Sequence, residues 1–242
     1  LPRYVYNTIV LMVGVGILST IFGVSSAWVV TRYNFFGKNF FEWALLLPAA
    51  VPAYIIAYTY TDFLEYAGPF QKFLREMFNW NSANDYWFPE IRSMGGAILV
   101  MSCVLYPYIY MMTRASFLTV PLSFYQTSLI YGRSSFFSVA LPLARPGIFA
   151  GLALVLMETI SDFGTVDYFA LETLTLGIFN VWIGMNSITS AAQLSVVTFI
   201  FIITLLLVEI RSRAASKYYD TSRGQSHTLV MKLNGKVIFL LS

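Results

Sequence analysis

The sequence predicts an all-α protein, a bundle of helices that crosses a membrane about five times. Hydrophobic residues make up 57% of the 242 residues and charged residues only 11%, and the mean hydropathy is +0.67. A soluble domain carries about 25% charged residues, so most of this surface is expected to face lipid. Five apolar runs approach the roughly 20 residues that a span needs, and none alternates with period two as a barrel strand does.

The expected spans follow one another without long interruptions. On the first, Ser19, Gly23 and Ala27 recur every four residues, which favours a face for close helix contact. Pro48, Pro52 and Pro107 lie inside expected spans, where either a static kink or a moving hinge fits. The five runs are Asn7–Val30, Trp43–Thr61, Gly95–Thr113, Gly147–Ser161 and Ala191–Val208.

The distribution of basic residues predicts the orientation of the chain. Residues 31–41, 114–146 and 211–236 together hold 11 of the 15 Lys and Arg residues. Lys and Arg are enriched in cytoplasmic loops, so these three segments are expected on the cytoplasmic side. Residues 62–93 and 162–190 are then expected on the opposite side. The net charge of +3 is therefore the sum over two faces, and it gives no reason to expect nucleic-acid binding.

The cytoplasmic segment 114–146 is too polar to span and too long for a turn. Ser123 is expected to cap a short helix that runs through Tyr131, with Gly132 as the left-handed residue after its end. Ser134 or Ser135 is expected to cap a second short helix, Phe136–Leu141, ended by Pro142, and Pro146 to begin the next span. Two interpretations stay open for this element: a docking surface for a partner, or an interfacial loop that anchors the bundle. Its expected exposed aromatic residues are Phe124, Tyr125, Phe136 and Phe137.

Three carboxylates mark the candidate route of a solute. Glu158 and Asp162 lie four residues apart on one helix face, and Asp167 follows just beyond Gly164. Counted from Gly147, Glu158 is about 16 Å into its helix, near the membrane midplane. An acid at that depth usually faces a water-filled path or a partner inside the bundle, and both alternatives stay open.

Other chemistry is sparse in the sequence. His227 stands alone, Cys103 is the one cysteine, and no acid, His or Cys cluster has metal-site spacing. No Gly-rich phosphate-binding loop is present, so we expect no nucleotide, cofactor or metal to be bound by this chain. A membrane enzyme would need a catalytic cluster that is not found. A secondary transporter, with Glu158 as an ion or proton relay, remains an alternative to an ATP-driven system.

Several motifs resemble the permease subunits of ABC importers, and the iron(III) branch in particular. These permeases carry a cytoplasmic loop of the form Glu-Ala-Ala, three residues, Gly, nine residues, Ile, one residue, Leu-Pro. Gly132 matches the Gly, Val139 the Ile, and Leu141-Pro142 the Leu-Pro. Gln126, Thr127 and Ser128 stand where Glu-Ala-Ala would be, and the interval from Gly132 to Pro142 is three residues short. Similar family stretches are Leu47–Tyr54, Tyr106–Tyr110 and Met157–Phe169.

The resemblance implies a function and a set of partners. The chain would be the first half of a fused two-half permease, lacking its opening helix, with residues 1–213 as the transmembrane domain. Residues 214–242 would be a cytoplasmic linker and the start of the next span. The loop would couple to a separate ATPase subunit that holds ATP and Mg. A periplasmic solute-binding protein would deliver ferric iron in the bacterial inner membrane, although other solutes fit the same motifs, and Glu158, Asp162 and Asp167 would line the path.

Overall fold

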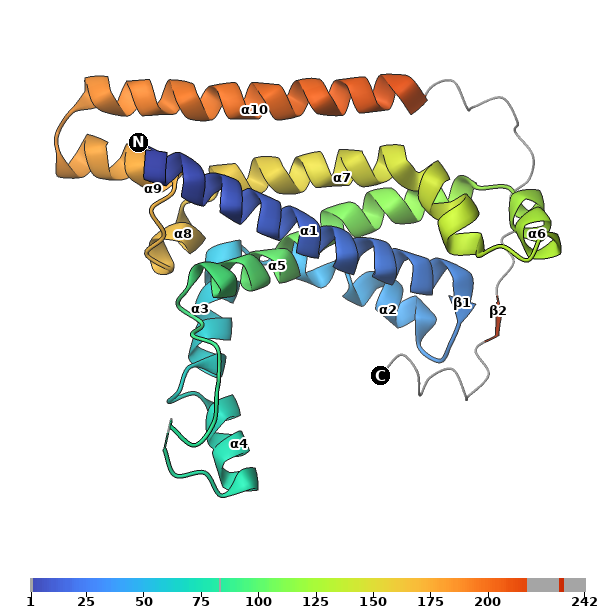
Figure 1. Ribbon diagram of the computed structural model, residues 1–242, viewed down its shortest axis with the longest axis horizontal. Helices are drawn as coiled ribbons and strands as arrows, with labels where there is room; N and C mark the ends of the chain where they lie inside the picture. The colour runs from blue at the N-terminus through green and yellow to red at the C-terminus, as the bar shows by residue number, and fades with distance from the viewer. Residues whose placement is uncertain (1, 83, 217–230, 233–242) are drawn as a thin grey trace. The chain divides into compact units, whose positions relative to one another are not determined.

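The computed structural model describes residues 2–82, 84–216 and 231–232, and these are almost entirely helical (Figure 1). Within this described part of the chain, four helices are long and apolar enough to cross a membrane, and a fifth candidate is an interrupted pair. The prediction of a polytopic helix bundle with about five spans is confirmed. The helices are α1 (Pro2–Arg32), α2 (Lys38–Ala44), α3 (Ala53–Leu64), α4 (Pro69–Phe78), α5 (Met94–Thr119), α6 (Leu122–Ile130), α7 (Leu141–Ser161), α8 (Gly164–Tyr168), α9 (Leu174–Phe179) and α10 (Ile188–Ser216).

Short elements join these helices. A 3₁₀ turn, Leu47–Ala50, precedes α3, and π-helical turns occupy Phe136–Ala140 and Asn180–Gly184. Strands β1 (Tyr33–Asn34) and β2 (Met231–Lys232) pair in parallel over two residues each. Most of the expected linker, 214–242, lies outside the described residues.

The chain divides into two compact units, each made of three stretches of sequence. Unit 1 comprises Leu1–Leu18, Val51–Val104 and Leu156–Ile203, and unit 2 comprises the intervening stretches. Every segment expected in the cytoplasm falls in unit 2, and both segments expected on the other side fall in unit 1. The units therefore group the loops in the way that the basic-residue distribution predicts.

In unit 1 the core forms where the first part of α1 meets α5 and the short helix α9. Val15 and Met101 are fully buried, and the Thr8 hydroxyl accepts a hydrogen bond of 3.0 Å from the backbone N–H of Leu174. A Cβ on Gly14 would lie 2.5 Å from the Ile98 side chain, so α1 and α5 approach closely here.

In unit 2 the helices α1, α5 and α7 meet at small residues. A Cβ on Gly23 would lie 2.8 Å from the Ile109 Cβ, and one on Gly151 would lie 2.7 Å from the Ile109 Cα. Ser19 and Ala27 are fully buried on the same helix as Gly23. The contact face predicted from the spacing of small residues is confirmed, and its role is close approach of backbones.

Two expected helix boundaries were wrong, and each had been placed with respect to a proline. The run Trp43–Thr61 is not one helix, because the chain leaves helical geometry before Pro52, which has ψ 136° and precedes α3. A residue before proline disfavours the α region, and proline donates no hydrogen bond to continue a helix. Conversely, Pro146 does not begin a span but lies inside α7, which starts at Leu141. Pro107 lies within continuous α5.

Candidate functional site

The coupling helix, as we call α6, ends in a Schellman motif. Gly132 adopts φ +63°, its N–H donates to the Leu129 carbonyl at 3.0 Å, and the Arg133 N–H donates to the Ser128 carbonyl at 2.9 Å. These two bonds satisfy carbonyls that the helix end would otherwise leave open. The predicted left-handed role of Gly132 is confirmed. Nothing lies within 4 Å of a Cβ added there, so the backbone conformation alone requires glycine.

The beginning of the coupling helix differs from the prediction. Pro121 is the capping residue, with extended backbone and no side-chain cap, and Ser123 lies inside the helix. The π-helical turn Phe136–Ala140 runs directly into α7, so no separate second helix exists and Pro142 does not end one. A π turn places one extra residue in the helix and shifts the hydrogen-bond register. The coupling helix is therefore linked to α7 by only five residues, 131–135.

The expected coupling residues divide into an exposed group and a buried group. Gln126, Thr127 and Gly132 are exposed, Ser128 and Val139 are buried, and Leu141 and Pro142 are half-buried. The hydroxyl groups of Ser128 and Ser135 lie 2.9 Å apart and join the coupling helix to the chain ahead of α7. A hollow of about 520 Å³ opens beside them, lined by Ser123, Phe124, Thr127, Ser128, Tyr131, Arg133, Ser138 and Val139.

An aromatic cluster under the coupling helix anchors it to the spans. The centroid of the Trp28 ring on α1 lies 5.6 Å from the ring centroid of Phe117, 6.4 Å from that of Tyr125 and 5.0 Å from that of Phe136. Tyr125 is only 4% exposed, and the Arg32 guanidinium lies 4.9 Å from its ring centroid. The expectation that Tyr125 and Phe136 are exposed docking residues was wrong, because both pack inward on Trp28. Phe124 and Phe137 are exposed as expected, and Leu129, Ile130 and Tyr131 are exposed as well.

An ion pair and a hydrogen bond attach α2 to α5 in unit 2. Arg114 pairs with Glu42 at 3.0 Å, and the Tyr110 hydroxyl donates to the Glu42 carbonyl at 3.4 Å. Both ionic side chains are about one-third exposed or less. The sequence analysis missed this pair, because the two residues lie 72 positions apart and no local pattern joins them.

The three candidate path carboxylates have different environments. Glu158 is exposed, and its helix starts at Leu141, so the acid lies in the last turn, about 5 Å from Ser161. The expected helix start at Gly147 was therefore wrong, and the expected depth of Glu158 near the membrane midplane stays a prediction. Asp167 is also exposed, on α8. Whether these acids line a route for solute stays a prediction.

Asp162 has a structural task that the sequence analysis did not identify. Its carboxylate accepts hydrogen bonds from the backbone N–H of Thr165 at 2.9 Å and of Val166 at 3.3 Å, and from the Thr165 hydroxyl at 3.2 Å. It thereby caps the first turn of α8. Burial raises the pKa of the Asp162 carboxyl above its ordinary value, while these hydrogen bonds oppose the shift.

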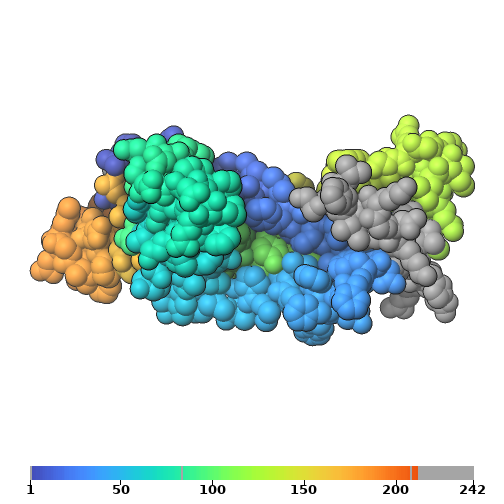
Figure 2. Space-filling model, turned by 90° about the horizontal axis from the view of Figure 1, so that it is seen from below, coloured from blue at the N-terminus to red at the C-terminus, as the bar shows by residue number. Residues whose placement is uncertain are grey.

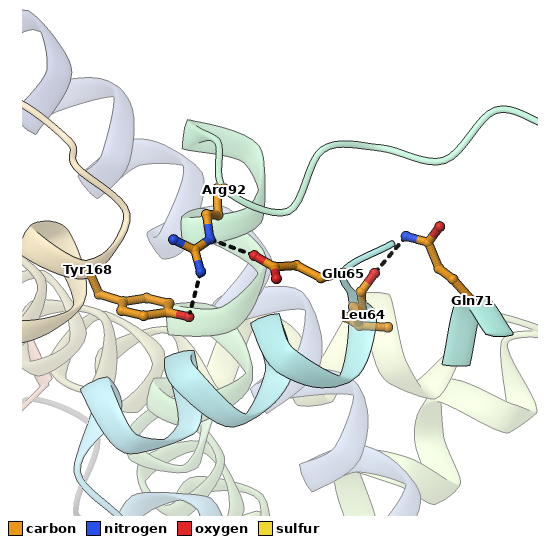
Figure 3. A network of polar contacts seen from close by, with 5 residues as sticks. All are labelled: Leu64, Glu65, Gln71, Arg92 and Tyr168. Atoms are coloured by element: carbon orange, nitrogen blue, oxygen red, sulfur yellow. Dashed lines mark hydrogen bonds and ion pairs between the residues drawn. The ribbon is translucent and has the colours of Figure 1, made fainter. Parts of the chain in front are cut away.

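In unit 1, residues 65–82 and 84–92 form a folded arm that is closed at its base (Figure 3). The Arg92 Nε lies 2.5 Å from Glu65 Oε1, and Arg92 Nη2 donates to the Tyr168 hydroxyl at 3.5 Å. The Gln71 amide donates to the Leu64 carbonyl at 2.7 Å. A cavity of about 430 Å³ lies along this base. No sequence signal joined Glu65 to Arg92, which are 27 residues apart.

Within the described residues, no group of three His, Cys, Asp or Glu side chains is placed to hold a metal ion. The geometry thus offers an exposed α6 anchored on α1, a capped α8 and a closed arm.

Comparison with protein families decides which class of membrane protein this is. Residues 19–223 match the model for the binding-protein-dependent transport system inner membrane component. The chain belongs to this family. The family is a membrane component of transport systems, so the chain is a multi-pass part of a membrane permease. This finding weighs against the membrane-enzyme and secondary-transporter interpretations.

Relatives within the permease family carry names for several solutes. The chain is 28% identical to the Fe(3+)-transport system permease protein FbpB 2 of Haemophilus influenzae, over 93% of this chain and 40% of that protein. It is 27% identical to the molybdenum permease ModB of the same organism, over 79% of the chain and 84% of the relative. A probable sulfate permease, cysT of Chlorella vulgaris, is also 27% identical, over 62% of this chain and 54% of that protein. The chain thus spans about two fifths of the iron permease.

Solved structures confirm the permease fold. The chain is similar to a MetNI methionine ABC transporter chain in an inward-facing conformation, with a TM-score of 0.61 at 16% identity, covering 89% and 94% of the two chains. A bacterial ABC transporter that imports the polysaccharide alginate gives a TM-score of 0.59 at 13% identity, covering 90% and 79%. At this identity the likeness concerns the fold alone.

Proposed function

We propose that this chain forms the permease half of an ATP-driven importer, in which a separate ATPase subunit docks on the coupling helix. The family match carries the proposal, and the coupling helix supplies the surface. Its exposed residues Phe124, Leu129, Ile130 and Tyr131 have no cover among the described residues, although large apolar groups rarely gather in water. ATP and Mg would then be bound by the ATPase subunit.

A rigid attachment supports this role. The coupling helix ends in the Schellman motif at Gly132, and its Tyr125 packs on Trp28 and Arg32 of α1. A displacement of the helix by the ATPase would therefore be transmitted to α1. The loop departs from the family pattern in the missing acid at Gln126 and in the interval that is three residues short. The π turn that continues into α7 accommodates the shorter interval, because no second helix has to be completed.

We further propose that the full protein receives ferric iron from a periplasmic binding protein and works with a second permease half. The match to the Fe(3+) permease covers 93% of the chain, more than either other relative described above. Hard oxygen ligands such as Glu158 and Asp167 suit a hard trivalent cation in transit. A molybdenum-type oxyanion is the second candidate, because the chain covers 84% of ModB.

The test is uptake by the full-length permease reconstituted with its ATPase and binding protein. Labelled ferric iron, molybdate and sulfate are offered separately, with and without ATP. ATP-dependent uptake of ferric iron alone is the expected result. ATP-dependent uptake of molybdate instead would contradict the assignment of ferric iron as the solute but support the assignment as an importer. Uptake that persists without the ATPase would overturn the importer itself.

A further inference from the structure

The arm, residues 65–92, contains an amphipathic helix with part of its apolar side uncovered. On α4, Phe73, Met77 and Phe78 are 60%, 54% and 52% exposed, whereas Gln71 is 5% exposed and faces the arm's interior. Phe73 and Met77 lie four residues apart and so share one face. Lys72 and Glu76, also exposed, lie together on the neighbouring face. An apolar stripe bordered by charges is typical of a helix at a boundary between water and a less polar phase.

Internal contacts hold the arm in a defined shape. The Tyr86 hydroxyl donates to Gln71 Oε1 at 2.6 Å and accepts from Arg75 Nη1 at 2.9 Å. The Arg75 guanidinium also lies 4.2 Å from the Tyr66 ring centroid. Together with the Glu65–Arg92 pair at the base, these contacts use the polar side of α4 to fold the arm. Phe73 and Met77 are left pointing away from it.

The direction of the arm indicates what meets that face. Within unit 1, α3 and α4 run across the direction of the first part of α1 and of α5, rather than along it (Figure 1). Because those stretches belong to candidate spans, an element that runs across them lies along the membrane plane. Figure 2 shows the same arm nearly end-on, with its tip toward the viewer.

The apolar surface of the arm continues a surface that is expected in lipid. On α3, Ile55, Tyr58 and Phe63 are 42%, 61% and 47% exposed, and most of α3 belongs to the apolar run Trp43–Thr61. Aromatic residues gather along the arm as they do where a membrane meets water: Phe70, Phe73, Phe78, Trp80, Tyr86, Trp87 and Phe88. A soluble protein that docked on α4 would not require the apolar surface of α4 to be continuous with that of α3.

We propose that α4 is an interfacial helix, which lies in the membrane surface on the non-cytoplasmic side that the basic-residue distribution predicts for this segment, and inserts Phe73 and Met77 among the lipids. In this proposal, segment 62–93 does not extend into water as its polar residues suggest. It lies along the membrane surface beside the spans. The inference goes beyond the import function and holds whichever solute is carried.

The test places a fluorescent probe on each face of α4 in the full-length permease. A single cysteine at Met77 or Lys72, in a Cys103→Ser background, is labelled with bimane in vesicles of phosphatidylethanolamine and phosphatidylglycerol. Brominated lipid should quench the Met77 probe several-fold more than the Lys72 probe, and aqueous iodide should show the reverse order. A cysteine at Phe73 repeats the apolar measurement if Met77→Cys disturbs folding.

Three results would overturn the proposal. Iodide quenching of both probes would place the arm in water. Equal quenching of both probes by brominated lipid would show that both faces of α4 lie in lipid, so that the helix has no preferred face toward the membrane. Protection of the Met77 site from both quenchers would show that protein covers it, which would make the face a docking surface for a partner.

Discussion

The Arg32 guanidinium, at the end of the first span, lies 4.9 Å from the ring centroid of Tyr125 in the middle of the coupling helix. Both residues are buried, at 5% and 4% exposed. The contact joins the element proposed to meet the ATPase directly to α1, because a cation over an aromatic face is attracted most strongly where water is excluded.

We expect this cation–π contact to stabilise the docked position of the coupling helix. Tyr125→Leu should lower the free energy of unfolding, and Arg32→Gln should add little to that loss once the ring is gone. A double-mutant cycle on thermal unfolding in detergent should give a coupling energy of about 0.5 to 2 kcal/mol. Tyr125→Phe is the control, since it keeps the ring. Additive losses would mean that the two side chains act independently.

Gly132 should be replaceable only by a residue that tolerates the left-handed region. Gly132→Val should cost about 1 to 2 kcal/mol at that position and loosen the Schellman motif, with lower stimulation of the ATPase. Gly132→Asn is the matched variant and should keep most of the activity, because asparagine adopts positive φ more readily. The measurement is nucleotide hydrolysis by the reconstituted complex. Equal hydrolysis by Gly132→Val and the parent would show that this turn does not couple.

Asp162 should make stability fall as the pH rises. A carboxyl whose folded pKa is raised binds more protons when folded than when unfolded, so its stabilising contribution is present below the unfolded value of about 4 and is lost as the pH rises through the folded pKa. Asp162→Asn should remove this pH dependence and keep the cap on α8. Asp162→Ala should lose the cap, at about 1 kcal/mol. Thermal unfolding across that pH range separates the variants, and a wild-type slope retained in Asp162→Asn would contradict the assignment.

Glu158 should matter for transport and not for folding. Its side chain is exposed and no hydrogen-bond partner of it is found in the described part of the chain, so Glu158→Gln should change the free energy of unfolding by less than about 0.5 kcal/mol. If the carboxylate lines the solute path, uptake should drop while ATPase binding is kept. Asp167→Asn, on the neighbouring helix, provides a comparison. Normal uptake by Glu158→Gln over a range of solute concentrations would exclude the path role.

The sequence by itself determined the features that depend on composition and local geometry. Low charge and long apolar runs require a helical membrane protein, because a backbone in lipid must satisfy its own hydrogen bonds. Gly132 and the small residues at Ser19, Gly23 and Ala27 were identifiable because a turn and a close approach each restrict side-chain size locally. The motifs around Gly132 and Pro142 were enough to indicate the permease family.

Only the tertiary structure decided where helices break and which distant residues meet. Pro52 interrupts a run while Pro146 is tolerated within α7, and the difference depends on neighbours that no local pattern reveals. Tyr125 reads as an exposed aromatic residue until Trp28 and Arg32 are placed against it. The Glu65–Arg92 pair closes the arm across 27 positions. Such contacts are set by how the helices pack, and packing joins residues whose separation in the sequence carries no signal.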